Sequence, residues 1–199
     1  MGPLCWRAGC GMVWRGVLGG GEMDGLKPAN ANAWYVLMTL YGEQVGEEID
    51  EDLHARNRAA WNAWSCQGMD DQARAAAASS KVSIAELSAW PELKADVTAL
   101  HRAAMLERNG AGFDYPGLPD VAATVDLRQV AFDHLLVLQR TVFSGDTLFG
   151  VAKFSGFAYF PKAEFGAVGR DHVAIFTGCQ FEKPTSLYDA IFHSRYPDF

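Results

Sequence analysis

Residues 141–165 read TVFSGDTLFGVAKFSGFAYFPKAEF, and this stretch decides the fold. A large apolar residue returns every five or six positions, and the units are separated by glycine or polar residues. Followed outward, the pattern runs from Val125 to Tyr196 as two interleaved series, each with an 11-residue spacing. Self-similarity at a fixed period is typical of a solenoid, whose stacked units share one continuous core.

The repeat predicts which side chains point inward. A small residue stands two positions before most of the large ones, as Ala152 does before Phe154. Four units make a turn of 22 residues, so we expect Phe132, Phe154 and Phe176 in one stack and Phe143, Phe165 and Leu187 in another. A β-sandwich is the alternative, but Phe154–Phe160 lacks the alternation of such strands. The predicted core residues are Leu127, Phe132, Leu138, Phe143, Phe149, Phe154, Phe160, Phe165, Phe176, Phe181, Leu187 and Phe192.

The repeat units carry a family resemblance. Thr141–Gly145 (TVFSG), Ala152–Gly156 (AKFSG) and Ala158–Phe160 (AYF) resemble the repeats of Phe-rich bacterial pentapeptide repeat proteins. The resemblance implies a right-handed quadrilateral β-helix, here of about three turns over residues 120–199. Residues 34–62 resemble the segment that precedes the repeats in one group of proteobacterial members. The expected fold class is therefore α+β, with a small α-helical region before the β-helix.

One interruption of the repeat is visible between Phe165 and Phe176. Asp171 stands where the second series expects a large apolar residue. We expect a bulge over residues 166–173, with Val168 or Val173 turned inward instead.

The region before the repeat divides into two parts. Residues 1–28 contain many glycines and no unbroken apolar stretch, which predicts a disordered extension, with Met23 as an equally sensible first residue. Residues 29–119 are predicted to be mainly helical. Since a solenoid end exposes stacked rings and unpaired backbone, we expect these helices to cap the first turn.

Local signals place the individual helices. Asn32 is a plausible N-cap for a buried segment that ends at Gly42, for which a helix is favoured slightly over a strand. A helix is expected over residues 52–66, where the acidic run 43–52 suits the helix dipole better than it suits a binding surface. The Ala-rich, polar composition of residues 67–80 predicts a mobile or weakly helical connection. Ser83 and Glu86 form a capping-box pattern, and Pro91 fits the first turn of a helix that stops near Asn109.

The far end of the repeat has no helix in the sequence to cover it. The tail could fold over the last turn, the end could pair with a second molecule, or the solenoid could be a truncated one. We favour an end-to-end homodimer, which would bury Phe192, Tyr196 and Phe199.

No catalytic, cofactor or metal motif is recognisable in the sequence. The phosphate-binding, dinucleotide-binding, nucleophile-elbow and zinc-protease signatures are missing, and the five histidines lie far apart. Four cysteines without metal spacing indicate reduced thiols in the cytoplasm, and no apolar run reaches the length of a membrane span. We therefore expect a non-enzymatic cytoplasmic protein of bacterial type, without a cofactor.

Charge restricts the partners. The net charge of −7 disfavours direct nucleic acid binding. The leading interpretation is a scaffold that binds an unidentified protein partner through outward residues of the β-helix, and the candidates are Lys153, Tyr159, Lys162, Glu164, Arg170, Asp171 and His172. The alternative, implied by the resemblance, is a DNA mimic that binds DNA gyrase or another topoisomerase. That role needs an acidic β-helix, whereas residues 125–199 carry only a net charge of −1.

Overall fold

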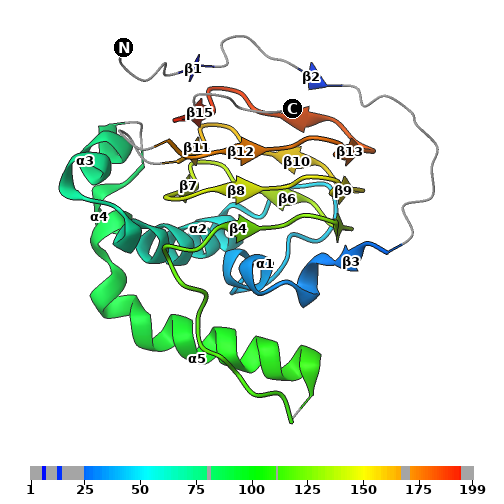
Figure 1. The fold of residues 1–199 in the computed structure, drawn as a ribbon, viewed down its shortest axis with the longest axis horizontal. Coiled ribbons are helices and arrows are strands. Elements are labelled where there is room, and N and C mark those ends of the chain that lie inside the picture. The colour runs from blue at the N-terminus through cyan, green and yellow to red at the C-terminus, as the bar shows by residue number, and fades with distance from the viewer. Residues whose placement is uncertain are drawn as a thin grey trace.

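The computed structural model describes residues 25–79, 82–110, 112–166 and 171–193, and the two short strands Trp6–Arg7 and Val13–Trp14. A group of helices lies beneath a stack of short strands (Figure 1). The helices are η1 (Ala29–Ala31), α1 (Ala33–Met38), α2 (Glu51–Ser65), η2 (Cys66–Gly68), α3 (Asp71–Ser79), α4 (Ile84–Ser88) and α5 (Trp90–Asn109).

The C-terminal strands form four sheets, which the chain visits in the same order three times. The first circuit is β4 (Val125–Asp126), β5 (Val130–Phe132), β6 (Leu136–Val137) and β7 (Val142–Phe143). The second is β8 (Thr147–Leu148), β9 (Lys153–Phe154), β10 (Ala158–Tyr159) and β11 (Glu164–Phe165). The third is β12 (Ala174–Ile175), β13 (Gln180–Phe181), β14 (Thr185–Ser186) and β15 (Ile191–Phe192). Successive circuits pair in parallel, so each strand lies above its counterpart.

Phenyl rings stack between circuits, but not all in the predicted columns. Phe132 and Phe154 stack with their centroids 4.7 Å apart, as expected, and the next ring of that column is Phe181, also at 4.7 Å. Phe176 instead stacks on Phe149 at 4.8 Å. Likewise Phe192, and not Leu187, lies on Phe165 at 5.0 Å. The prediction is therefore wrong for the third ring of each column, because the third circuit is shifted by one side of the stack.

The interruption at residues 166–173 causes this shift. Thr147 pairs with Val125, which is 22 residues before it, and with Ala174, which is 27 residues after it. Five extra residues therefore lie between the second and third circuits, and every later strand moves to the next side. Val173 is 37% exposed, so it does not turn inward as one alternative predicted. Val168, the other alternative, lies outside the described residues.

The predicted core is largely confirmed. Ten of the twelve large residues are buried, whereas Phe181 and Leu187 of the third circuit are only partly so. The small residues lie between them, and Thr147, Ala152 and Ala163 have no exposed surface. Parallel stacking of rings and close walls fill the interior at ordinary packing density.

The helices begin largely where the sequence predicts. Asn32 caps α1 by accepting the backbone N–H of Trp34 at 2.9 Å, although α1 ends at Met38 rather than at Gly42. α2 begins after Asp50, whose side chain caps it. Ser83 precedes α4 but makes no side-chain capping bond, so the predicted capping box does not form.

The Glu86 side chain does not take part in the predicted capping box, because its carboxylate binds Arg58 instead. The guanidinium of Arg58 donates to both oxygens of Glu86 at 2.8–3.2 Å. A charge-assisted, bidentate pair of this kind is stronger than a hydrogen bond to one backbone N–H.

The helices cover the first circuit, as predicted. Tyr35 of α1 meets the edge of Phe132, and Trp61 of α2 packs on Phe143 at 5.2 Å. α2 also supplies hydrogen bonds to the lower edge of β7: Trp61 Nε1 donates to the carbonyl of Val142 at 2.9 Å, and Asn62 Oδ1 accepts the N–H of Val142 at 2.9 Å. Helices and strands thus share one core.

The N-terminal segment contributes three short strands. β3 (Lys27–Pro28) pairs in parallel with β5, below the first circuit. β1 (Trp6–Arg7) and β2 (Val13–Trp14) pair antiparallel with β15 and β14, above the third circuit. These three strands lie within residues 1–28; the disordered extension stays a prediction for residues 1–5, 8–12 and 15–24, which lie outside the described residues.

Candidate interaction surface

Each sheet presents one outward residue per strand, and the four sides differ in chemistry. The β5–β9–β13 side carries Lys153, which binds Glu182 at 2.9 Å. The β6–β10–β14 side carries Tyr159 and Ser186, which are in register. Since side chains alternate across a strand, the residue before each inward phenylalanine faces outward.

The β7–β11–β15 side is covered. Val142 on β7 has no exposed surface and packs against Cys66, Met69 and Leu87 from η2 to α4. Higher on the same side, Glu164 is 2% exposed, and His193 Nε2 donates to its Oε1 at 2.8 Å. This side is therefore occupied by the protein's own helices and by buried polar contacts.

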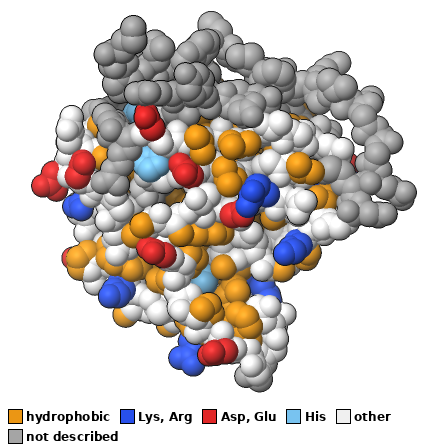
Figure 2. Space-filling view, viewed as in Figure 1, with side chains coloured by type: hydrophobic (Ala, Val, Ile, Leu, Met, Phe, Trp, Pro, Cys, Tyr) orange, Lys and Arg blue, Asp and Glu red, His pale blue; other side chains and the backbone are white. Residues whose placement is uncertain are grey.

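On the β4–β8–β12 side, the outward residues of β8 and β12 are apolar and open among the described residues, whereas β4 carries Asp126. Leu148 and Ile175 are partly exposed and in register on neighbouring strands, and Val151 and Val173 beside them are 44% and 37% exposed. We call these four residues the β8–β12 face. Figure 2 shows hydrophobic side chains gathered over β8 and β12.

Charged pairs border the β8–β12 face. Arg128 binds Asp126 at 2.7 Å below it, and this hydrogen bond lowers the pKa of the Asp126 carboxyl. His172 Nδ1 lies 3.3 Å from Asp146 Oδ1 at the end of the face where β8 and β12 begin. An apolar centre with a polar rim is the usual anatomy of a protein–protein interface.

An open hollow of about 820 Å³ adjoins the β8–β12 face. Val151, Gly150 and Thr177 line it from the strand stack, and Lys27 and Trp34 line it from below. Val151 adopts a φ of 60°, a left-handed conformation that is strained for a β-branched residue. A strained, exposed valine therefore projects at the junction of the face and the hollow.

The structure does not gather the sequence-predicted partner-facing residues on one surface. Lys153 and Tyr159 face outward, but on adjacent sides, and Lys162 occupies the corner after β10. Glu164 is buried against His193, so its expected exposure is wrong.

The remaining candidates lie at the interruption. Asp171 is exposed just before β12, and His172 is half-buried beside Asp146. Arg170 is outside the described residues.

Sequence reasoning missed the β8–β12 face, although a signal was available. Leu148 and Ile175 directly precede Phe149 and Phe176, at the position that Lys153 occupies before Phe154. Two aliphatic residues at outward positions of the repeat indicate an apolar side. Their adjacency was hidden because the five extra residues put 27 positions between them.

Buried titratable groups have structural partners. Burial lowers the pKa of His101, which contacts the hydroxyl of Tyr115 and the carbonyl of Ala33. Burial raises the pKa of Cys66 to about 12 and that of Cys179 to about 11, so both thiols are protonated at neutral pH and are poor nucleophiles.

The described ranges contain neither a metal cluster nor a membrane-spanning helix. No group of three or more His, Cys, Asp and Glu residues there is placed to hold a metal ion. No helix in this part of the chain is both long and apolar enough to cross a membrane.

The comparisons with known proteins give no relative for this chain. No protein-family model, no curated protein and no solved structure matches it.

Proposed function

We propose that this chain is a pentapeptide-repeat scaffold of the Phe-rich bacterial type, in which a right-handed quadrilateral β-helix binds another protein. Support for the family comes from three four-strand circuits whose phenyl rings stack at 4.7–5.0 Å. Short parallel strands on four sides, with one large inward residue per side, are what the resemblance implies.

The observation that carries the interaction role is the β8–β12 face. Burying Leu148, Val151, Val173 and Ile175 against an apolar segment of a partner would release water from adjoining aliphatic groups, at about 25 cal/mol for each Å². The adjacent β7–β11–β15 side shows how such a face is covered within this chain, since Val142 is covered by η2, α3 and α4. We therefore propose that the occupant is a protein segment with an apolar face.

A pull-down assay that compares wild-type protein with surface variants tests this role. Immobilised wild-type protein and an Ile175→Lys variant are compared with Ser186→Lys, which places the same charge at the outward position of β14. We expect a discrete protein that wild type and Ser186→Lys retain and that Ile175→Lys loses at least tenfold. Equal capture by all three, with unchanged thermal unfolding, would contradict the assignment of the face.

The second candidate function is interaction with a topoisomerase by charge mimicry. Its support is the overall charge of −7, which the strand-forming region hardly shares because it carries a net −1. Inhibition of gyrase supercoiling by micromolar protein would favour this role, and no effect in that assay would remove it.

A further inference from the structure

The upper edge of β15 is oriented to accept another strand. Ile191 and His193 donate their N–H groups down to the carbonyls of Ala163 and Phe165, at 2.8 and 2.9 Å. Peptide groups alternate in direction along a strand, so the N–H and C=O of Phe192 point up, away from β11.

The edge of β14 has the same geometry. The carbonyls of Ser186 and Tyr188 accept the N–H groups of Phe160 and Lys162 from below, both at 2.8 Å. The peptide groups of Thr185 therefore point up.

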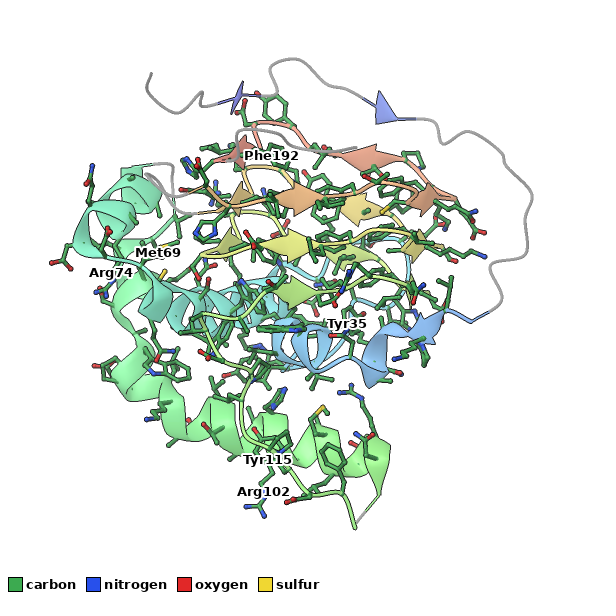
Figure 3. The ribbon with its side chains drawn as sticks, viewed as in Figure 1. Tyr35, Met69, Arg74, Arg102, Tyr115 and Phe192 are labelled. Atoms are coloured by element: carbon green, nitrogen blue, oxygen red, sulfur yellow. The ribbon has the colours of Figure 1, made fainter. Side chains whose placement is uncertain are left out.

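The N-terminal strands meet these two residues. Trp6 is in register with Phe192, and Trp14 is in register with Thr185. Both pairings are antiparallel, whereas the other strand pairs described for the four sheets are parallel. Figure 3 shows Phe192 on the uppermost circuit, next to β1.

The spacing of β1 and β2 suits two adjacent sides of the stack. Residues 8–12 separate the two strands, and residues 187–190 separate β14 from β15. The N-terminal segment thus runs backward over the third circuit, first on β15 and then on β14.

We propose that the upper edge of β14 and β15 is a strand-acceptor site, that its resident occupants are the strands β1 and β2 of this chain, and that an added peptide carrying both strand sequences can replace them. Main-chain hydrogen bonds hold strands that add to a sheet edge. Each such bond replaces a bond to water and is weak in net terms, so two dipeptide strands form an exchangeable cover. This site is separate from the β8–β12 face.

The cover extends over two of the four sides. By the same alternation, the peptide groups of Phe181 and Ala174 point up, because Gln180 donates to Ala152 and Ile175 accepts from Phe149. No strand lies above β12 or β13 among the described residues. Replacement of β1 and β2 therefore changes the exposure of β14 and β15 and leaves the other two edges as they are.

Hydrogen exchange on the full-length chain tests the resident pairing. Because Trp6 and Trp14 pair with the upward-pointing peptide groups of Phe192 and Thr185, their N–H groups face β15 and β14. The double variant Trp6→Pro/Trp14→Pro removes that N–H donor from each added strand and disfavours both pairings. We expect the amides of Thr185 and Phe192 to exchange about tenfold faster or more, while those of Ile191 and His193, bonded to the circuit below, stay unchanged. Leu18→Pro, which lies between β2 and β3, is the matched control and should resemble wild type.

Binding in trans tests the replacement. A labelled synthetic peptide of residues 1–22, kept under reductant, is titrated into each protein, and its fluorescence anisotropy is followed. We expect one peptide to bind per double-variant chain, at least tenfold more tightly than to wild type or to Leu18→Pro. Identical exchange at Thr185 and Phe192 in all three proteins would overturn the proposal. So would a double variant that forms dimers without binding the peptide, since the edge would then accept a second copy.

Discussion

Asn62 makes the hydrogen bonds that a neighbouring strand would make to the lower edge of β7, and its substitution should destabilise the protein strongly. Its Oδ1 accepts the N–H of Val142 at 2.9 Å, and its Nδ2 donates to the carbonyl of Arg140 at 3.1 Å. These are a donor and an acceptor two residues apart on one edge, which is the spacing that a parallel strand would use. The second proton of Nδ2 goes to Glu86 at 3.0 Å, so the whole amide is used.

The magnitude of this effect follows from burial. Asn62 and Val142 have no exposed surface, so Asn62→Ala leaves the buried N–H of Val142 and the carbonyl of Arg140 without this partner, while the Glu86 carboxylate keeps only Arg58. An unsatisfied buried group costs about 1–3 kcal/mol, and we expect a total loss of about 3–5 kcal/mol in the free energy of unfolding. Asn62→Asp should not rescue stability, because it keeps the acceptor but turns a second carboxylate toward Glu86.

Urea unfolding, followed by circular dichroism and tryptophan fluorescence, measures this loss. The control is Asn109→Ala on the exposed end of α5, where one bond to the carbonyl of Met105 is lost, and we expect a change below about 1 kcal/mol. A loss of less than about 1 kcal/mol for Asn62→Ala, with an unchanged denaturant slope, would refute the role of Asn62 in satisfying the edge.

Three further predictions concern close approach, backbone strain and pH. A Cβ at Gly156 would clash with the backbone carbonyl oxygen of His134, so Gly156→Ala should lower the free energy of unfolding by about 3 kcal/mol in urea unfolding. Gly145→Ala, with its nearest atom at 3.8 Å, should change it little. Val151→Asn should raise the free energy of unfolding by about 1 kcal/mol in the same assay, because asparagine relieves the left-handed strain. A free energy of unfolding below that of wild type would contradict that reasoning. Burial lowers the pKa values of His54 and His101 below those of the unfolded chain, so the unfolded state binds more protons in acid. The contribution of these two buried histidines to the free energy of unfolding should therefore be fully present above about pH 6.5 and decrease from there toward pH 5. The unfolding temperature of His101→Gln should depend less on pH than that of wild type.

The inward half of the strand stack was predictable because it depends on local spacing. The recurrence of a large residue every five or six positions, preceded by a small one, predicts which side chains point inward. Phe132, Phe149 and Phe165 are buried as this spacing predicts. Helix starts were similarly local, since Asn32 caps its own helix two residues away. Signals of this kind act within a few residues and do not require the rest of the fold.

The columns of rings and the surface were not predictable in the same way. Five extra residues in 166–173 move Phe176 onto Phe149, and only the strand register reveals which side receives it. The failed capping box has a similar cause, because Glu86 binds Arg58 from another helix. In both cases a contact between distant segments competes with the local pattern and prevails.

The sequence alone determined that phenylalanines and leucines at a fixed period build the interior, because burying a large residue at each repeat is favourable whatever surrounds it. The tertiary structure decided what lies outside that interior: the helices over β7, the buried Glu164, the open β8–β12 face and the antiparallel strands on β14 and β15. The physical reason is that inward positions are specified by the chain's own periodicity. Outward positions take their role from segments far away in sequence that cover them or leave them exposed.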